Sequence, residues 1–124
     1  MVTTAKRSRF ESGSIAWFLQ RVTAVVLLFT LAFHFIWLHY VNHAAEVTLW
    51  DSALRMNQLV YFLVMVVFLV TATFHGINGI YNALLNRGLS GRARKVAFWL
   101  FAVFGLVVIA QGMRISFALA GVVG

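Results

Sequence analysis

The sequence has no cysteine, no proline and few charged residues, which make up only 10% of its 124 residues. Without cysteine, the chain forms no disulfide, no thiolate metal site and no dithiol redox motif. A soluble domain normally carries about 25% charged residues, so this composition indicates a protein whose surroundings are lipid. Without proline, no membrane helix is broken by a proline kink.

The residues that are present form long apolar runs. Three stretches contain no Asp, Glu, Lys or Arg: 22–45, 56–86 and 96–113. They approach or exceed the roughly 20 residues that a helix needs to cross a bilayer. We therefore predict an all-α, multi-pass membrane protein with one membrane domain over 1–124 and three transmembrane helices at approximately 15–40, 57–84 and 96–119.

Basic residues concentrate at the start of the first predicted helix and between the second and third: Lys6, Arg7, Arg9, Arg21, Arg87, Arg92, Arg94 and Lys95. The other two, Arg55 and Arg114, fall on the opposite side. The positive-inside rule then places the N-terminus in the cytoplasm and the C-terminus outside. The net charge of +7 reflects this topology, attraction to anionic membrane lipid or docking of a cytoplasmic partner. It indicates no nucleic acid, because no folded soluble face carries these residues.

The connection between the first two helices, residues 41–56, holds most of the polar residues on the outer side. We expect an outer loop there, with the option of a short interfacial helix that carries Trp50. His39 and His43 lie at the outer edge of the first helix, and we interpret both as ordinary interface histidines.

Two histidines lie within the predicted spans, His34 late in the first and His75 late in the second. Each shares a helical face with small or polar residues: Gln20, Thr23 and Thr30 for His34, and Thr71, Asn78, Gly79 and Asn82 for His75. Ionisable residues within a span usually face a bundle interior and carry function. Two interpretations are open: neutral histidines that hydrogen-bond across helices, and histidines that bind a ligand.

Among ligands, the pattern favours haem over zinc. Zinc usually takes four nitrogen, sulfur or oxygen ligands, and this chain offers no cysteine and no acidic residue within a span. Haem iron needs only one or two axial imidazoles. Gly76 and Gly79 would let the macrocycle lie against the backbone, and Arg21 would provide a cation for its propionates. The alternative role of Arg21 is an interfacial anchor whose charge reaches back to water.

The depths of the two histidines indicate two haems. If the first helix enters the hydrocarbon near Trp17, His34 lies about 25 Å from that inner edge. If the second helix leaves near Tyr81 or Leu84, His75 lies roughly 9–13 Å from the same edge. The difference of about 12–16 Å is too large for one iron to bridge. We therefore expect each histidine to ligate a different haem, with the second axial ligand supplied by a partner chain.

Several motifs resemble those of a known family. They are Trp17-Phe18-Leu19-Gln20-Arg21-Val22-Thr23-Ala24, His34 late in the first helix, and His75-Gly76-x-Asn78-Gly79 late in the second. In this order, with three helices, they are similar to the small membrane-anchor subunits of succinate dehydrogenase (succinate:quinone oxidoreductase), the cytochrome b subunit of D type. A histidine in both helices resembles the two-haem class, in which the chain is half of a two-subunit haem-binding helix bundle.

The resemblance implies a function in electron transport. The subunit would hold a flavoprotein subunit and an iron–sulfur subunit at the cytoplasmic face of the cell membrane, pair with a second anchor of C type, and pass electrons through haem b to quinone. Succinate oxidation would occur elsewhere, because this chain has no flavin or dicarboxylate site. The expected cofactor-binding residues are His75, His34, Arg21, Gly79, Thr71 and Asn78, with the two histidines as iron ligands. The alternative is a haem-free structural or transport subunit whose histidines only hold helices together.

The sequence departs from the family near the end of the second helix. Related anchors commonly carry an Asp-Tyr pair near the quinone site, eleven and twelve residues after the histidine, where this chain has Asn86 and Arg87. Quinone is therefore expected to bind mainly to partner chains, or to use Trp17, Arg21 or Asn82 of this chain.

Overall fold

The computed structural model describes residues 14–41 and 43–122. In chain order they form α1 (Ile15–Ile36), a π-helical turn η1 (Trp37–Val41), a 3₁₀ turn η2 (Ala44–Glu46), α2 (Leu49–Asn57), α3 (Leu59–Asn86) and α4 (Gly91–Gly121). The described residues contain no strand, which confirms the all-α fold. Lys6, Arg7 and Arg9, which contribute to the predicted orientation, lie outside the described residues.

Three helices are long and apolar enough to cross a membrane: Ile15–Val41, Leu59–Asn86 and Gly91–Gly121. In the most apolar window of each, at most 11% of the residues are buried within the chain. The other apolar side chains are therefore left for lipid or for other subunits, as in a multi-pass membrane protein. The orientation of the two ends across the membrane stays a prediction.

Local sequence explains where the first two helices begin. Ser14 caps α1, because its Oγ accepts a hydrogen bond from the Trp17 backbone N–H at 3.1 Å. A capping box starts α2: the Asp51 backbone N–H donates to Thr48 Oγ1 at 3.2 Å, and the Thr48 backbone N–H donates to Asp51 Oδ2 at 2.9 Å. This helix is the short one anticipated in the outer loop, and it carries Trp50, which is 55% exposed.

Two helices extend beyond the ranges anticipated from hydropathy. The α4 helix begins at Gly91, five residues before the predicted position 96, because Arg and Lys are good helix formers although they do not belong in hydrocarbon. The α3 helix continues to Asn86. It ends in a Schellman motif, with the Gly88 N–H donating to Leu85 O at 3.0 Å and the Leu89 N–H to Leu84 O at 3.1 Å. Gly88 has φ +95°, a conformation that favours glycine.

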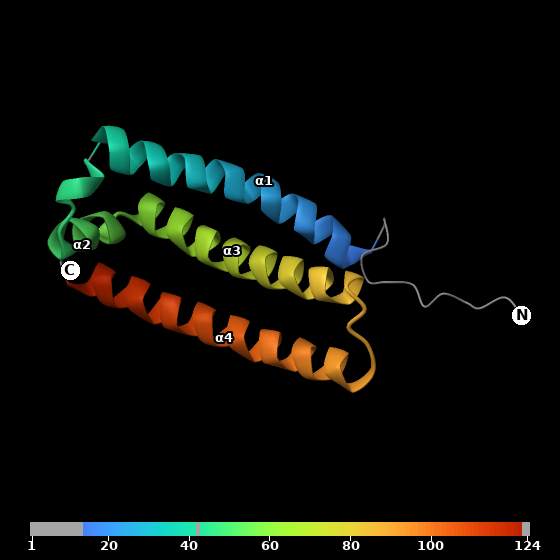
Figure 1. Cartoon of the computed structure of the whole chain (residues 1–124). Coiled ribbons are helices and arrows are strands. Elements are labelled where there is room, and N and C mark those ends of the chain that lie inside the picture. The colour runs from blue at the N-terminus through green and yellow to red at the C-terminus, as the bar shows by residue number, and fades with distance from the viewer. Residues whose placement is uncertain (1–13, 42, 123–124) are drawn as a thin grey trace, which may run out of the picture.

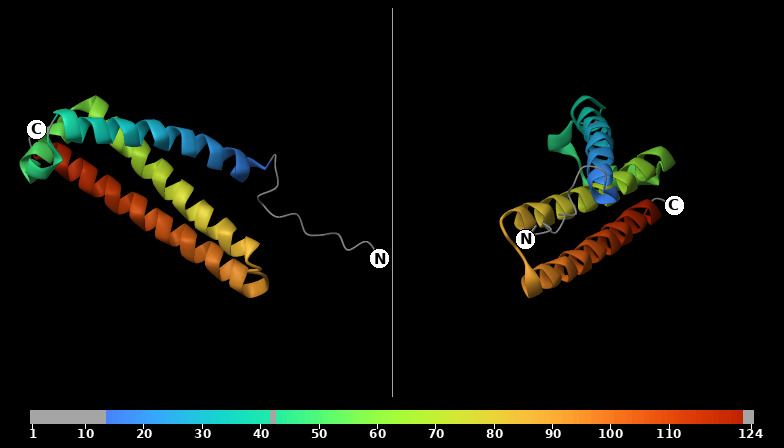
Figure 2. Two further views of the ribbon diagram at one scale, coloured as in Figure 1. Left: turned by 45° about the horizontal axis from the view of Figure 1, so that its top comes forward. Right: turned by 90° about the vertical axis from the view of Figure 1, so that its right-hand side faces the viewer.

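The helices are arranged around α3, which packs against α1 on one side and α4 on the other (Figure 1). The turned views show α4 running alongside α3, whereas α1 crosses it at an angle (Figure 2). The α2 helix lies across one end and packs on α3 and α4. We call this the α2 end, and we call the opposite end, where residues 87–90 connect α3 to α4, the loop end. The start of α1 lies at the loop end and the end of α4 at the α2 end.

Small residues allow α4 to approach α3 closely. A Cβ atom added at Gly112 would lie 2.5 Å from Leu69 Cδ2, and one added at Gly105 would lie 2.7 Å from Ile77 Cδ1. At the α2 end, Asn57 Nδ2 donates to Ala120 O at 3.0 Å. Together these contacts hold α3, α4 and the end of α2 as one packed unit.

Candidate functional site

The α1 and α3 helices meet through polar side chains near the loop end, where His75 lies. We call this group the His75 cluster: Gln20 and Thr23 from α1 with His75, Asn78 and Gly79 from α3. The sequence placed Gln20 and Thr23 on the face of His34, whereas the structure brings them to His75 because α1 crosses α3 at this point. Side chains of this kind join membrane helices by hydrogen bonds within apolar surroundings.

The hydroxyl of Thr23 lies 3.1 Å from Nδ1 of His75. The same oxygen lies 2.7 Å from Leu19 O and 3.2 Å from Gln20 O, to which a hydroxyl can only donate. When the hydroxyl donates to one of these carbonyls, it accepts from Nδ1–H of His75, and the lone pair of the ring is then on Nε2, the form in which an imidazole binds a metal through Nε2. Thr23 is itself buried, at 8% exposure.

Gln20 occupies the space beside the other ring nitrogen. Its Nε2 donates to His75 O at 3.2 Å and lies 3.4 Å from His75 Nε2. Asn78 Nδ2 donates to Gln20 Oε1 at 2.7 Å. A Cβ atom on Gly79 would lie 3.3 Å from Gln20 Nε2. Gln20 therefore lies over the backbone of Gly79 and hydrogen-bonds to His75 and Asn78.

Two further residues predicted for the site make other contacts. The Thr71 hydroxyl donates to Val67 O at 2.6 Å and to Phe68 O at 3.2 Å, both in its own helix. The Arg21 guanidinium lies 4.0 Å from the ring centroid of Trp17 and is exposed, as expected for an interfacial anchor. The structure thus gathers His75, Asn78 and Gly79, while these contacts give Thr71 and Arg21 partners outside the cluster.

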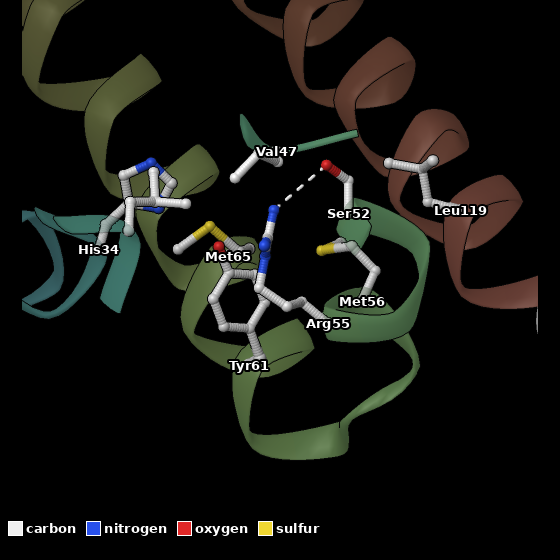
Figure 3. Close-up of a pocket in the computed structure, with 9 residues that line it drawn as sticks. His34, Val47, Ser52, Arg55, Met56, Tyr61, Met65 and Leu119 are labelled. Atoms are coloured by element: carbon white, nitrogen blue, oxygen red, sulfur yellow. Dashed lines mark hydrogen bonds between the residues drawn. The ribbon is translucent and has the colours of Figure 1, made fainter. Parts of the chain in front are cut away.

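His34 has very different surroundings at the α2 end. Its ring stacks on Phe68 with centroids 6.2 Å apart and an interplanar angle of 5°. Its Nδ1 is buried and has no hydrogen-bond partner. The ring lines a cavity of about 430 Å³, which we call the His34 cavity (Figure 3). Other residues that line it include Val47, Ser52, Arg55, Met56, Tyr61 and Met65.

Arg55 is the residue of this cavity that the sequence did not reveal. It was counted as a loop charge, but only 6% of it is exposed. Its Nη2 donates to Ser52 Oγ at 3.2 Å, and Figure 3 shows the side chain pointing into the cavity. Its burial results from the folding of α2 back over α3 and α4, and nothing in the spacing of the sequence signals that packing.

The two histidines are well separated. From Thr23, the neighbour of His75, to His34 is about 16 Å along α1 at 1.5 Å per residue. From Phe68, the neighbour of His34, to His75 is about 10 Å along α3. The two distances place the rings about two to three helical turns apart. The first lies at the upper end of the range estimated from the sequence, and the second lies below that range.

The remaining histidines do not add to either site. The His39 Nδ1–H donates to Phe35 O at 3.1 Å, and the ring stacks on Phe35. His39 and His43 are both exposed. Within the described residues, no three His, Cys, Asp or Glu side chains gather into a group that could hold a metal ion.

The residues considered for quinone lie toward the loop end. Asn82 is only 4% exposed, and its Nδ2 donates to Asn78 O at 2.6 Å. It lines a largely apolar cavity of about 480 Å³ between α3 and α4, together with Tyr81. Asn86 is the last residue of α3 and Arg87 caps that helix, and both are exposed.

Comparisons with known proteins agree on a family for the chain. The family model described as "Succinate dehydrogenase/Fumarate reductase transmembrane subunit" matches residues 2–110. A protein of Thermoplasma acidophilum named "Succinate dehydrogenase hydrophobic membrane anchor subunit" is 26% identical over 110 residues, which cover 85% of this chain and 86% of that protein. No solved structure matches the chain.

Proposed function

Because this chain belongs to the family of succinate dehydrogenase and fumarate reductase transmembrane subunits, we propose that it binds haem b through His34 and His75 and relays electrons to membrane quinone. Its role as a membrane anchor of that complex, in association with the other subunits, follows from the family and from the three apolar helices. The binding of haem, the route of the electrons and the identity of the partner chains are the parts that we propose.

The contact of 3.1 Å between Thr23 Oγ1 and His75 Nδ1 is the observation that carries this proposal. With the Thr23 hydroxyl donating to Leu19 O, Thr23 accepts a hydrogen bond from Nδ1–H, and the lone pair of His75 is then on Nε2. Residues that bond the second nitrogen of a metal-binding histidine orient the ring and raise its basicity. The His75 cluster therefore fits an axial haem ligand.

Gln20 must change position for His75 to bind iron. Its contact with His75 Nε2 is long, at 3.4 Å, and its other hydrogen bonds are to uncharged groups. A flexible side chain of this kind can turn away at modest cost. Removing it from the space over Gly79 leaves backbone without a Cβ beside His75, which suits the close approach of a flat macrocycle.

The His34 cavity fits a second haem for a different reason. His34 presents an imidazole with an unpartnered Nδ1 on the wall of a cavity of about 430 Å³. The cavity has an aromatic ring, a thioether and a cation in its lining. Bound haem would supply a one-electron redox group here, while the protein would orient it and set its electrostatics.

The exposed faces of the helices leave room for the partner chains. Each histidine would hold one haem, and a C-type anchor that covers the apolar surface of α1 and α3 would supply the other protein ligand. The iron–sulfur and flavoprotein subunits would dock at the loop end, where Arg87, Arg92 and Lys95 are exposed. Quinone would accept the electrons at a site built mainly from the partner chains.

The competing function is a haem-free anchor. Its support is that both ring nitrogens of His75 lie within 3.4 Å of polar atoms on α1, so the ring can also serve only to join two helices. The haem content of the complex, purified through this subunit and expressed per flavin, separates the two functions. We expect two haems b per flavin, whereas an intact complex without haem would establish the competing function.

A further inference from the structure

A long apolar groove lies between α3 and α4, where the two helices run alongside each other (Figure 2). It is the cavity of about 480 Å³ that Tyr81 and Asn82 line, and its lining continues to Val70 on α3 and to Ile109 on α4. From Asn82 to Val70 is about 18 Å along α3 at 1.5 Å per residue. The hydrocarbon of one leaflet is about 15 Å thick, half of a core of about 30 Å. This α3–α4 groove therefore extends from the loop end over about the depth of one leaflet.

The polar side chains of the α3–α4 groove bond within the protein. The Thr73 hydroxyl donates to Leu69 O at 2.7 Å. Asn78 Nδ2 donates to Gln20 Oε1 at 2.7 Å, and Asn82 Nδ2 donates to Asn78 O at 2.6 Å. Most of the other lining side chains are aliphatic or aromatic. The surface that the groove offers to a ligand therefore suits a hydrocarbon chain.

A second cavity, of about 630 Å³, adjoins the groove at the loop end. Tyr81 and Phe98 line both cavities, and their rings meet edge to face with centroids 6.0 Å apart. The second cavity is also lined by three cations: Arg92, Arg94 and Lys95. We call it the basic cavity. A groove of apolar character thus joins a cationic site at the end where the helices leave the membrane.

The cations of the basic cavity have no acidic side chain beside them in the described part of the chain. Glu46 and Asp51 are the acidic residues within the described ranges, and both lie at the α2 end. The third acidic residue of the sequence, Glu11, is outside those ranges. The positive-inside rule places the loop end at the cytoplasmic leaflet, where anionic lipids are found. An anion from that leaflet would complement the basic cavity.

We infer that the α3–α4 groove binds one acyl chain of an anionic phospholipid whose phosphate lies in the basic cavity. The guanidinium of Arg94, which is half-buried, can bind phosphate through two parallel hydrogen bonds. Trp99, which is 67% exposed, also lines the basic cavity, as expected for an aromatic residue at headgroup level. A quinone has an uncharged ring and would leave the cations without an anionic partner. Such a lipid would bind whether or not the complex holds haem.

The experiment titrates the delipidated complex, purified through this subunit, with phosphatidylglycerol and with phosphatidylcholine of the same acyl chains. Native mass spectrometry counts the bound lipids and gives the Kd of the first one. Arg94→Gln removes a cation from the basic cavity, and Ala102→Phe fills the groove. The matched controls are Arg87→Gln and Val103→Phe. Both of these residues are exposed, and neither lines the groove or the basic cavity.

We expect the wild type to bind phosphatidylglycerol more tightly than phosphatidylcholine. Arg94→Gln should weaken the binding of phosphatidylglycerol about fivefold, which corresponds to about 1 kcal/mol for one basic residue at a membrane surface, and should weaken phosphatidylcholine less. Ala102→Phe should weaken both lipids, and the two controls should weaken neither. If Ala102→Phe does not assemble, the comparison of Arg94→Gln with Arg87→Gln decides.

Four results would overturn the inference. Equal losses in Arg94→Gln and Arg87→Gln would show a general attraction to the loop end, without a site. Unchanged binding of phosphatidylglycerol in Arg94→Gln is the second result, and unchanged binding of both lipids in an assembled Ala102→Phe complex is the third. The fourth is release of bound quinone, and not of phospholipid, by Ala102→Phe, which would assign the groove to quinone.

Discussion

The two intramembrane histidines lie in opposite kinds of surroundings. At the loop end, His75 is held by Thr23 and Gln20, and its polar neighbours bond to one another. At the α2 end, His34 lines a cavity, and its Nδ1 is buried without a hydrogen-bond partner, as is Trp37 Nε1. One histidine is thus oriented within the chain, whereas the other faces a space that is open to a ligand.

The difference shows how polar side chains are accommodated in a protein surrounded by lipid. Polar groups in a membrane must find partners within the protein, because lipid offers none. The His75 cluster meets this requirement inside a single chain, so the contact between Thr23 and His75 is present before any partner binds. The His34 cavity leaves the requirement unmet, so we expect the site at the α2 end to depend more on what binds there.

The largest effect is expected from replacing the hydroxyl that lies against His75. Thr23→Val keeps the shape of the side chain but removes the acceptor of the Nδ1 proton. We expect a ten- to hundredfold loss of affinity for the haem at His75, as is typical when the residue behind a metal-binding histidine is removed. The measurement is the retention of that spectral component during washing of the purified complex.

Thr30→Val is the matched control for this change. Thr30 lies on the same helix, is 9% exposed against 8% for Thr23, and also donates to a carbonyl of its own helix, Val26 O at 3.0 Å. The control should leave the His75 component unaffected. If both variants lose that component equally, general disturbance of α1 would explain the effect and the assigned role of Thr23 would be lost.

A smaller effect is expected from adding one methyl group over the His75 cluster. Ala replacing Gly gains up to about 1 kcal/mol of helix propensity. In Gly79→Ala the new Cβ would lie 3.3 Å from Gln20 Nε2, whereas in Gly76→Ala no atom lies within 4 Å. Gly76→Ala should therefore raise the temperature at which the purified complex dissociates, and Gly79→Ala should raise it less. Equal shifts would show that neither Gln20 nor the proposed macrocycle lies over Gly79.

The smallest expected effect is a loss of stability at low pH, and it is confined to the α2 end. Hydrogen bonds from the Thr48 side chain and backbone lower the pKa of Asp51 below its ordinary value of 3.8. A carboxyl whose pKa is lowered by folding stabilises the folded state above its ordinary pKa, and this contribution is lost as the pH falls through the lowered value. We therefore expect hydrogen exchange in α2 to accelerate as the pH falls below about 3.8, after correction for the intrinsic exchange rate.

Asp51→Asn serves as the control for this acid effect. Asparagine cannot titrate, so exchange in its α2 helix should be faster at neutral pH and should show no added acceleration in acid. The same acceleration in the variant would assign the titration to another group.

Hydropathy was sufficient to predict the three spans, because a long helix that is apolar on every side can face only lipid or other subunits. Helical spacing also placed Gln20 and Thr23 on one face of the first helix. It could not show that this face meets His75, since that depends on the angle at which α1 crosses α3. Arg55 was missed for a similar reason. Its burial depends on Ala53 and Met56 of α2, which are 0% and 8% exposed, packing against the bundle.

The most direct test is the dithionite-reduced minus oxidised spectrum of the complex purified through this subunit, for the wild type, His34→Ala and His75→Ala. Our account predicts that each variant loses a different part of the haem signal and that the two parts together make up the wild-type signal. Unchanged spectra in both variants would contradict it and would leave the histidines as packing residues in a membrane anchor.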